Sequence, residues 1–287
     1  MEQGYDERRG DAGVRLPLVA MSERKKVFFT SDAHLGSGYH ADPRAVEQRL
    51  VRWLRSIEDE ARAVYFLGDM FDYWFEYRAV VPRGHVRFLG QVALMHDAGV
   101  EIHFFAGNHD VWFSDYLQTE LGATIHHHAS VVELDGKRFR LAHGDEEYMG
   151  QRWTNKFLYK LFRNPLARWL YAGVHPRWTV GLALGLSLRS RQKGMKRRTL
   201  GQIPHAYHNA YFDVEKEWLV RWTKSYMPAH PEIDYYLFGH RHLLLDLSLR
   251  GGKRLVILGD WLQYNSFAVW DGENLFVDQF VEDDEAS

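Results

Sequence analysis

Residues 26–34 read KVFFTSDAH, an apolar run that is followed at once by an Asp-x-His pair. The run at residues 26–30 predicts a buried strand, because it is short, apolar and rich in residues that favour extended backbone. Side chains two positions apart on an extended segment point the same way, so Asp32 and His34 can both reach one metal ion. An Asp-x-His pair alone is more often an ordinary turn, and its meaning depends on the rest of the chain.

The same arrangement, a predicted strand followed by a polar cluster, occurs four more times. Strands are predicted at residues 63–67, 101–106, 138–142 and 235–238. The clusters that follow them are Gly68-Asp69-Met70-Phe71-Asp72, Gly107-Asn108-His109-Asp110, His143-Gly144-Asp145 and Gly239-His240-Arg241-His242. Because ligands of open α/β sheets bind beyond the carboxyl ends of the strands, we expect all five clusters to converge on one place.

The residue types in these clusters indicate a metal site. Each cluster carries Asp, Asn or His, and these side chains are ligands for Mn²⁺, Fe and Zn²⁺. The glycines before Asp69, Asn108 and His240 permit sharp turns and close backbone approach. Any one cluster is a weak signal, but the five together, in this order, predict a metal-dependent site.

The remaining sequence predicts an α/β protein with one insertion. The chain of 287 residues is 46% hydrophobic and contains no cysteine, which excludes a disordered chain, disulfides and thiolate metal sites. No apolar run approaches the ~18 residues that a spanning helix needs. We expect a flexible leader at residues 1–24, a main domain at residues 25–149 and 200–287, and an inserted helical cap at residues 150–199. Further elements are predicted as helices at residues 45–57 and 86–96 and as strands at residues 131–134, 255–258, 267–270 and 274–277.

Basic charge is concentrated in the insertion and its flanks. Residues 148–212 contain 12 Lys or Arg and no Asp or Glu, so the rest of the chain carries 24 basic against 38 acidic side chains. A positive segment in a negative protein suggests an anionic partner, which is phosphate, acidic lipid or nucleic acid. The simpler alternative is a solvated basic face.

In these five clusters the sequence resembles the calcineurin-like metallophosphoesterases, whose pattern is D-x-H, G-D-x-x-D, G-N-H-[DE], H and G-H-x-H. The resemblance implies a four-layer α/β sandwich that holds two divalent metal ions. It assigns Asp32, His34 and His242 to one ion, and Asn108, His143 and His240 to the other, with Asp69 as the bridge. Two ions ~4 Å apart can activate water and clamp the phosphoryl oxygens of a substrate.

The same resemblance implies roles beside the metal ions. His109 would stabilise the phosphoryl oxygens or protonate the leaving group, next to the ligand Asn108. Asp72 would orient His109, since a carboxylate can fix the tautomer of an imidazole. The other histidines are expected to be structural, and His126, His127 and His128 are expected to lie at the surface before a strand.

The second cluster continues as Gly-Asp-Met-Phe-Asp-Tyr-Trp-Phe-Glu, which resembles the G-D-x-[FL]-[ED]-x-W run of the UDP-2,3-diacylglucosamine hydrolases. That family cleaves the pyrophosphate of a nucleotide-sugar lipid, releasing UMP and 2,3-diacylglucosamine 1-phosphate for lipid A assembly. The resemblance implies Mn²⁺, with Fe and Zn²⁺ as alternatives, and a cytoplasmic protein that associates peripherally with the inner membrane. Many members carry Arg where this chain has His109, which points to a divergent branch.

Substrate contacts are expected from aromatic and basic residues in or near the insertion. Aromatic side chains at helical spacing would line a slot for acyl chains, where each buried CH₂ contributes ~0.8 kcal/mol. Basic side chains would bind the sugar phosphate or anionic lipid headgroups. The residues assigned to substrate binding are Trp74, Trp153, Phe157, Arg189, Arg191, Lys193, Lys196 and Arg197. An equally simple interpretation is that the aromatic residues only pack the cap onto the main domain.

Two other functions fit the same clusters. One is a phosphodiesterase that acts on another nucleotide or on nucleic acid, but the basic residues are mixed with leucine-rich stretches, which favours lipid, and no specific nucleic acid is expected. The other is a scaffold that keeps the fold without metal and only binds partners. The complete set of ligand residues argues against a scaffold.

Overall fold

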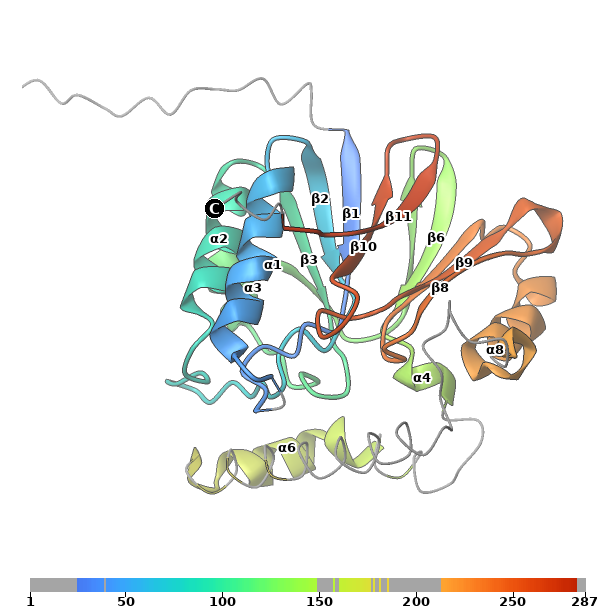
Figure 1. Cartoon of the computed structure of the whole chain (residues 1–287). Helices are drawn as coiled ribbons and strands as arrows, with labels where there is room; N and C mark the ends of the chain where they lie inside the picture. Colours follow the sequence, from blue (N-terminus) through green and yellow to red (C-terminus); the bar gives the residue numbers. More distant parts are fainter. Residues whose placement is uncertain are drawn as a thin grey trace, which may run out of the picture.

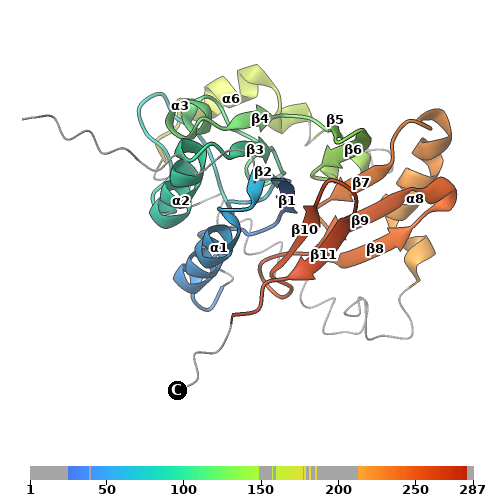
Figure 2. The ribbon, with the colours of Figure 1, turned by 90° about the horizontal axis from the view of Figure 1, so that it is seen from above.

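The computed structural model describes residues 25–38, 40–148, 157, 160–176, 178, 181, 185 and 213–282. In that part of the chain two β-sheets pack face to face, and helices cover the outer face of each sheet (Figures 1 and 2). The strand orders are β11-β10-β1-β2-β3-β4 and β5-β6-β7-β9-β8. The predicted four-layer α/β sandwich is therefore confirmed.

The six-stranded sheet has a parallel half and an antiparallel half. Its strands are β1 (Lys26–Thr30), β2 (Ala61–Phe66), β3 (Glu101–Phe105), β4 (Thr124–His126), β10 (Ser266–Trp270) and β11 (Leu275–Gln279). Strands β1 to β4 run parallel, whereas β10 pairs antiparallel with both β1 and β11. The carboxyl ends of β1, β2 and β3 therefore lie at one edge of the molecule.

The five-stranded sheet is also mixed. Its strands are β5 (Ser130–Leu134), β6 (Lys137–Ala142), β7 (Tyr235–Phe238), β8 (Leu244–Ser248) and β9 (Arg254–Leu258). Strands β6, β7 and β9 are parallel, while β5 and β8 pair antiparallel at the two edges. The sequence predicted most of these strands to within a few residues but predicted neither β4 nor β8.

Helices α1 (Pro43–Ile57), α2 (Val86–Asp97) and α3 (Tyr116–Leu121) cover the six-stranded sheet, and α8 (Trp218–Tyr226) covers the other (Figure 2). Helix α1 starts two residues before the predicted residue 45, because the side chain of Asp42 accepts hydrogen bonds from the backbone N–H groups of Arg44 and Ala45. Short α4 (Asp145–Tyr148) follows β6 directly. Three 3₁₀ turns lie at Val214–Lys216, Met227–Ala229 and Arg250–Gly252.

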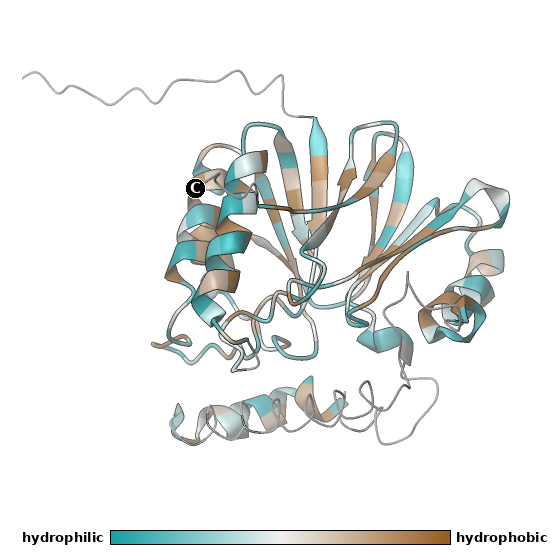
Figure 3. Cartoon of the chain, viewed as in Figure 1, coloured by the Kyte–Doolittle hydropathy of each residue, from teal (hydrophilic) through white to brown (hydrophobic). Residues whose placement is uncertain are grey.

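Hydrophobic side chains form separate cores between these layers. The colouring of Figure 3 shows many hydrophobic residues in the strands of both sheets. Between the sheets, the rings of Phe29 and Phe139 stack with centroids 5.9 Å apart. Under α1, the ring of Trp53 packs against Phe28 and Trp261. Burial of these large side chains on both faces of the sheets fixes the strand ends, which carry the five polar clusters.

The insertion is described only in part. Helix α6 (Pro165–Ala172) lies across the carboxyl ends of the strands (Figure 1). The side chain of Asn164 caps this helix by accepting hydrogen bonds from the backbone N–H groups of Leu166 and Ala167. Within the described part of the chain, none of the helices has the length and apolar character needed to cross a bilayer. The boundaries predicted for the cap, residues 150–199, stay a prediction.

Candidate metal centre

The polar clusters lie on strained backbone. Among the described residues, eight non-glycine residues have positive φ, and five of them are Asp32, His34, Asp69, His240 and His242. A left-handed conformation at such residues costs free energy, and it persists where the surrounding structure enforces it, most often at functional sites. Three of the five clusters, the first, the second and the fifth, thus share an unusual backbone geometry.

Two glycines let the clusters approach one another. A Cβ atom at Gly107 would lie 2.2 Å from Asp69 Oδ1, and one at Gly239 would lie 2.5 Å from Asp32 Oδ2. Both distances are far below van der Waals contact, so only glycine fits. The close backbone approach predicted for these two positions is therefore present in the structure.

Asp32, His34 and His242 form the first ligand group. Asp32 Oδ1 lies 3.6 Å from the Nε2 atoms of both histidines, and these two Nε2 atoms are 3.2 Å apart. Asp32 Oδ1 is buried and has no hydrogen-bond partner. A buried carboxylate oxygen that faces two imidazole nitrogens fits a divalent cation, which would satisfy all three atoms.

Asp69, His143 and His240 form the second ligand group. His143 Nε2 lies 3.3 Å from Asp69 Oδ2, 3.3 Å from His240 Nδ1 and 3.3 Å from Asn108 Oδ1. His143 Nδ1 donates to the backbone carbonyl of Leu67, so its Nε2 atom is free to bind an ion. The structure thus brings together the four residues that the sequence placed around the second ion.

Asp69 lies between the two groups. Its Oδ2 atom is 3.3 Å from His143 Nε2 in the second group and 3.7 Å from His34 Nε2 in the first. Its other oxygen, Oδ1, accepts a hydrogen bond from the backbone N–H of His109. This position is the one required of a carboxylate that bridges two ions.

The charges of three of the clustered groups suit metal binding, whereas His143 holds a proton more strongly: burial would lower its pKa, but Asp69 and Asp32 raise it well above its usual value. Burial alone would raise the pKa of Asp32, but His242, a hydrogen bond with His34 and His143 lower it to about 2. Burial would likewise raise the pKa of Asp69, but His143 and His109 hold that pKa well below its usual value. Burial and the neighbouring His143 lower the pKa of His240 to about 3. At neutral pH the two carboxylates are therefore ionised and His240 is neutral, which are the states that bind metal.

Asp72 and His109 lie beside the first group. His109 Nδ1 donates to the backbone carbonyl of Asp72 at 3.1 Å, and the Asp72 carboxylate is farther from it, at 3.7 Å. Asp72 Oδ1 also lies 3.5 Å from His34 Nδ1. The orientation of His109 thus rests first on the backbone of Asp72 rather than on its carboxylate. The His109 side chain is 21% exposed, so a substrate can reach it.

Asp110 fixes the loop that carries Asp69. Its carboxylate is fully buried and accepts hydrogen bonds from four backbone N–H groups, those of Asp69, Met70, Phe71 and Gly107. Burial and the neighbouring Asp69 raise the pKa of Asp110 to about 7, against the effect of these hydrogen bonds. Asp110 is the last residue of the third polar cluster.

Two supporting residues were not found from the sequence. Asp260 Oδ2 accepts a hydrogen bond of 2.9 Å from His242 Nδ1, and Asp260 Oδ1 accepts from three successive backbone N–H groups. Glu217 forms a two-pronged ion pair with Arg241, at 2.7 and 2.9 Å, and so holds the loop between His240 and His242. The Gly259-Asp260 pair follows strand β9, and this sixth polar strand end was the available signal.

Asp260→Asn is expected to weaken metal affinity ~10- to 100-fold, as loss of a group that orients a ligating histidine typically does. The amide would place a donor or a weaker acceptor against His242 Nδ1 and disturb its tautomer. Competition with a chelator measures the affinity, and Asp59→Asn, at an exposed aspartate, is the control. Unchanged affinity in Asp260→Asn would remove this role.

Of the residues predicted to bind substrate, the structure describes Trp74 and Phe157. Trp74 is fully buried in the hydrophobic core, and its indole N–H donates to Glu76 at 2.9 Å. Its position favours a packing role over contact with substrate. Phe157 is 60% exposed. Trp153, Arg189, Arg191, Lys193, Lys196 and Arg197 lie outside the described residues.

A different set of aromatic residues joins the cap to the main domain. The indole N–H of Trp112 donates to the backbone carbonyl of Phe162, and its ring lies 4.7 Å from that of Tyr171. The hydroxyl groups of Tyr73 and Tyr171 are 3.2 Å apart. These contacts place α6 beside the metal centre, and the cap therefore borders the site.

The fold and the paired ligand groups are those of a metallophosphoesterase. No family model matches the chain. It is 66% identical over 255 residues to the UDP-2,3-diacylglucosamine hydrolase of Porphyromonas gingivalis, a match that covers 89% of this chain and 97% of that protein. It is 28% identical over 238 residues to the protein of the same name from Escherichia coli, covering 81% and 90% of the two chains. The chain belongs to the UDP-2,3-diacylglucosamine hydrolase family, as the sequence motifs predicted.

Solved structures with a similar arrangement have low sequence identity. A dimetal phosphatase from Danio rerio is 14% identical, with a TM-score of 0.43, and the match covers 90% of this chain and 100% of that one. A phosphoesterase from Escherichia coli is 16% identical, with a TM-score of 0.39, covering 87% and 90%.

Proposed function

We propose that this protein hydrolyses the pyrophosphate bond of UDP-2,3-diacylglucosamine and releases UMP and 2,3-diacylglucosamine 1-phosphate. The observation that carries the proposal is the 66% identity to a hydrolase named for this substrate, along almost the whole length of that protein. The two ligand groups at the strand ends supply the chemistry that such a reaction needs. The product phosphate is an intermediate suited to lipid A assembly.

The two groups would hold two divalent metal ions, for which we propose Mn²⁺. Carboxylate, amide and imidazole ligands also suit Fe and Zn²⁺, and the absence of cysteine excludes thiolate ligands. When bound, such ions polarise phosphoryl oxygens and lower the pKa of water. The chain holds them with Asp32, His34 and His242 on one side and Asn108, His143 and His240 on the other, with Asp69 between.

His109 would act on the substrate itself. Its ring packs edge-on against His34 with centroids 4.9 Å apart, and its Nδ1 atom is engaged by Asp72. We propose that Nε2 acts on the phosphoryl oxygens or the leaving group, where an imidazole donates a hydrogen bond or a proton. The backbone carbonyl of Asp72 holds the ring of His109 in this position. Asn108, the residue before His109, would bind the second ion.

The described part of the cap has an exposed apolar face. Leu166, Trp169 and Leu170 on α6 are 62%, 70% and 59% exposed, although each is large and hydrophobic. Such a face suits a lipid-rich environment. We propose that it brings the protein to the cytoplasmic face of the inner membrane, where its lipid substrate lies, and that the basic residues 189–197 add attraction to anionic headgroups.

Trp169→Glu is expected to reduce binding to anionic lipid vesicles at least ~10-fold, because it removes a large apolar side chain from the contact and adds a negative charge. Vesicle co-sedimentation measures this binding. Val86→Glu is the matched control, since Val86 is 76% exposed on α2, outside the cap. Equal losses in the two variants, or none in either, would count against the cap as the membrane surface.

The substrate proposal is tested by removing the acyl chains. Hydrolysis of UDP-2,3-diacylglucosamine in mixed micelles should exceed that of UDP-N-acetylglucosamine by ~100-fold or more, because binding energy from remote parts of a substrate is used at the reacting centre. Equal rates would rule out recognition of the lipid. Turnover of a generic aryl phosphodiester without turnover of the lipid nucleotide would keep the metal centre and discard this substrate.

A further inference from the structure

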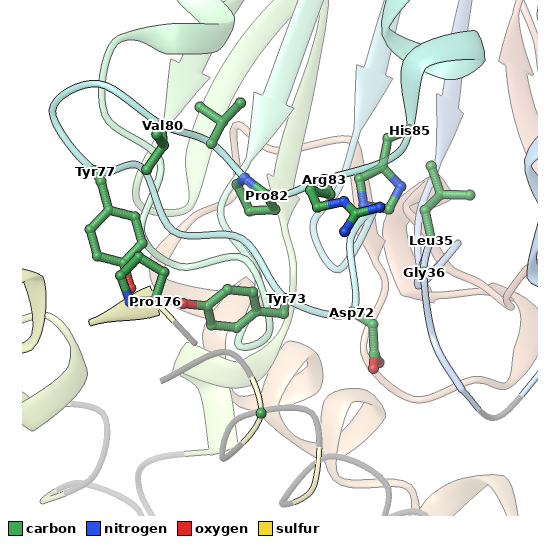
Figure 4. Close-up of a pocket in the computed structure, with 12 residues that line it drawn as sticks. Leu35, Gly36, Asp72, Tyr73, Tyr77, Val80, Pro82, Arg83, His85 and Pro176 are labelled. Carbon is green, nitrogen blue, oxygen red and sulfur yellow. The ribbon is translucent and has the colours of Figure 1, made fainter. Parts of the chain in front are cut away.

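A pocket of about 470 Å³ opens directly beside the metal centre. Its lining includes Asp72 of the second polar cluster, and Leu35 and Gly36, which directly follow the first. Asp72 lies 3.5 Å from the ligand His34, so a molecule in this pocket has one end at the reacting bond. Figure 4 shows that the other walls come from the segment between β2 and α2, with Pro176 of the cap at the rim.

The walls combine flat apolar surfaces with one cation. Tyr73, Tyr77 and Pro82 supply rings, and the guanidinium of Arg83 lies between Pro82 and His85 (Figure 4). Among the described residues, Arg83 has no ion-pair or hydrogen-bond partner, and no acidic side chain other than Asp72 lines the pocket. A guanidinium carries only hydrogen-bond donors, so it binds acceptors such as carbonyl or phosphoryl oxygens.

The two halves of a nucleotide-sugar lipid need different surroundings. The apolar face of α6 suits acyl chains, and the residues that form it, Leu166, Trp169 and Leu170, do not line this pocket. Arg83 is exposed to solvent, and an acyl chain seated against it would bury its charge without a partner, which is costly. A pyrimidine base offers a flat ring for the aromatic walls and carbonyl oxygens for the guanidinium. The volume also falls in the range typical of small-molecule sites, about 300–1,000 Å³.

We propose that this pocket binds the nucleoside half of the substrate and that Arg83 recognises the carbonyl oxygens of its pyrimidine base. The inference rests on the proposed function, because it takes the substrate to be a uridine nucleotide. It makes Arg83 a specificity-determining residue, while the metal ligands carry the reaction. The lipid half then lies toward α6, and the pyrophosphate lies over the metal centre between the two.

Arg83→Gln tests this assignment. In the Mn²⁺-loaded protein, the affinity for UMP measured by calorimetry should fall ~10-fold or more, and the preference for UMP over CMP should shrink. The KM for UDP-2,3-diacylglucosamine should rise with little change in kcat, and hydrolysis of bis(p-nitrophenyl) phosphate should not change. Arg78→Gln is the matched control, since Arg78 is exposed on the same segment but does not line the pocket.

The outcomes separate this inference from the proposed function. Unchanged UMP affinity in Arg83→Gln, with weaker binding of 2,3-diacylglucosamine 1-phosphate, would overturn the inference and place the lipid half in this pocket. A wild-type protein that does not bind UMP would overturn it as well. UMP binding that depends on Arg83, without hydrolysis of the lipid nucleotide, would support the pocket and contradict the proposed function.

Discussion

Asp69→Ala is expected to abolish loading of both metal ions and to lower hydrolysis at least ~10³-fold. Asp69 Oδ2 lies within 3.7 Å of ligand nitrogens from both groups, so its removal takes a ligand from each ion. Two-metal sites stabilise the transition state by several kcal/mol, and each ~1.4 kcal/mol corresponds to a factor of ten in rate. Metal content by elemental analysis and hydrolysis of an aryl phosphodiester measure the two effects.

Asp59→Ala, at an exposed aspartate outside the clusters, should keep both ions and full activity. Circular dichroism would establish that Asp69→Ala is folded, which is expected because Asp110 still holds the backbone of this loop. Two ions retained in Asp69→Ala would remove Asp69 as the bridge. The remaining ligands would then have to be assigned again.

His109→Ala should lower kcat ~10²- to 10⁴-fold while both ions stay bound, since a positioned acid or hydrogen-bond donor typically contributes this much. The His109 ring lies beside the first ligand group without being one of its metal ligands, and it is open to substrate. A loss in kcat larger than any change in KM would show action on the transition state. Steady-state kinetics and metal analysis are both required.

His96→Ala, at an exposed histidine on α2, is the control and should match the wild type. His109→Gln keeps a hydrogen-bond donor but cannot transfer a proton, so its rate separates the two roles assigned to His109. Loss of metal from His109→Ala would make His109 part of the ligand set, contrary to this account. Full activity of His109→Ala would exclude both roles.

The metal centre could be predicted from the sequence because its signals are local. Each cluster directly follows an apolar strand, and parallel strands bring their carboxyl ends to one edge without further information. For Asp32 and His34, the spacing of two residues was enough to predict that both side chains reach one ion. Asp260 was missed because its role depends on contact with His242, 18 residues away, and a Gly-Asp pair alone is an ordinary turn.

The features that the sequence did not predict form through contacts between parts of the chain that are distant in sequence. Strand β4 has three residues and exists through pairing with β3, which no local pattern reveals. His126 was expected at the surface before a strand, but it ends β4, stacks on Phe105 and lies 3.1 Å from His103. Trp74 follows the family pattern for a substrate contact, yet Glu76 and the ring of Phe71 hold it in the core.

The central claim is a metal-dependent hydrolysis that releases UMP from a lipid nucleotide. The most direct measurement is UMP release from UDP-2,3-diacylglucosamine by protein that has been stripped of metal and then given Mn²⁺. We expect no release from the stripped protein, full release after Mn²⁺ is restored, and none from Asp69→Ala under either condition. Release that persists in the stripped protein, or no release by protein that holds both ions, would contradict it.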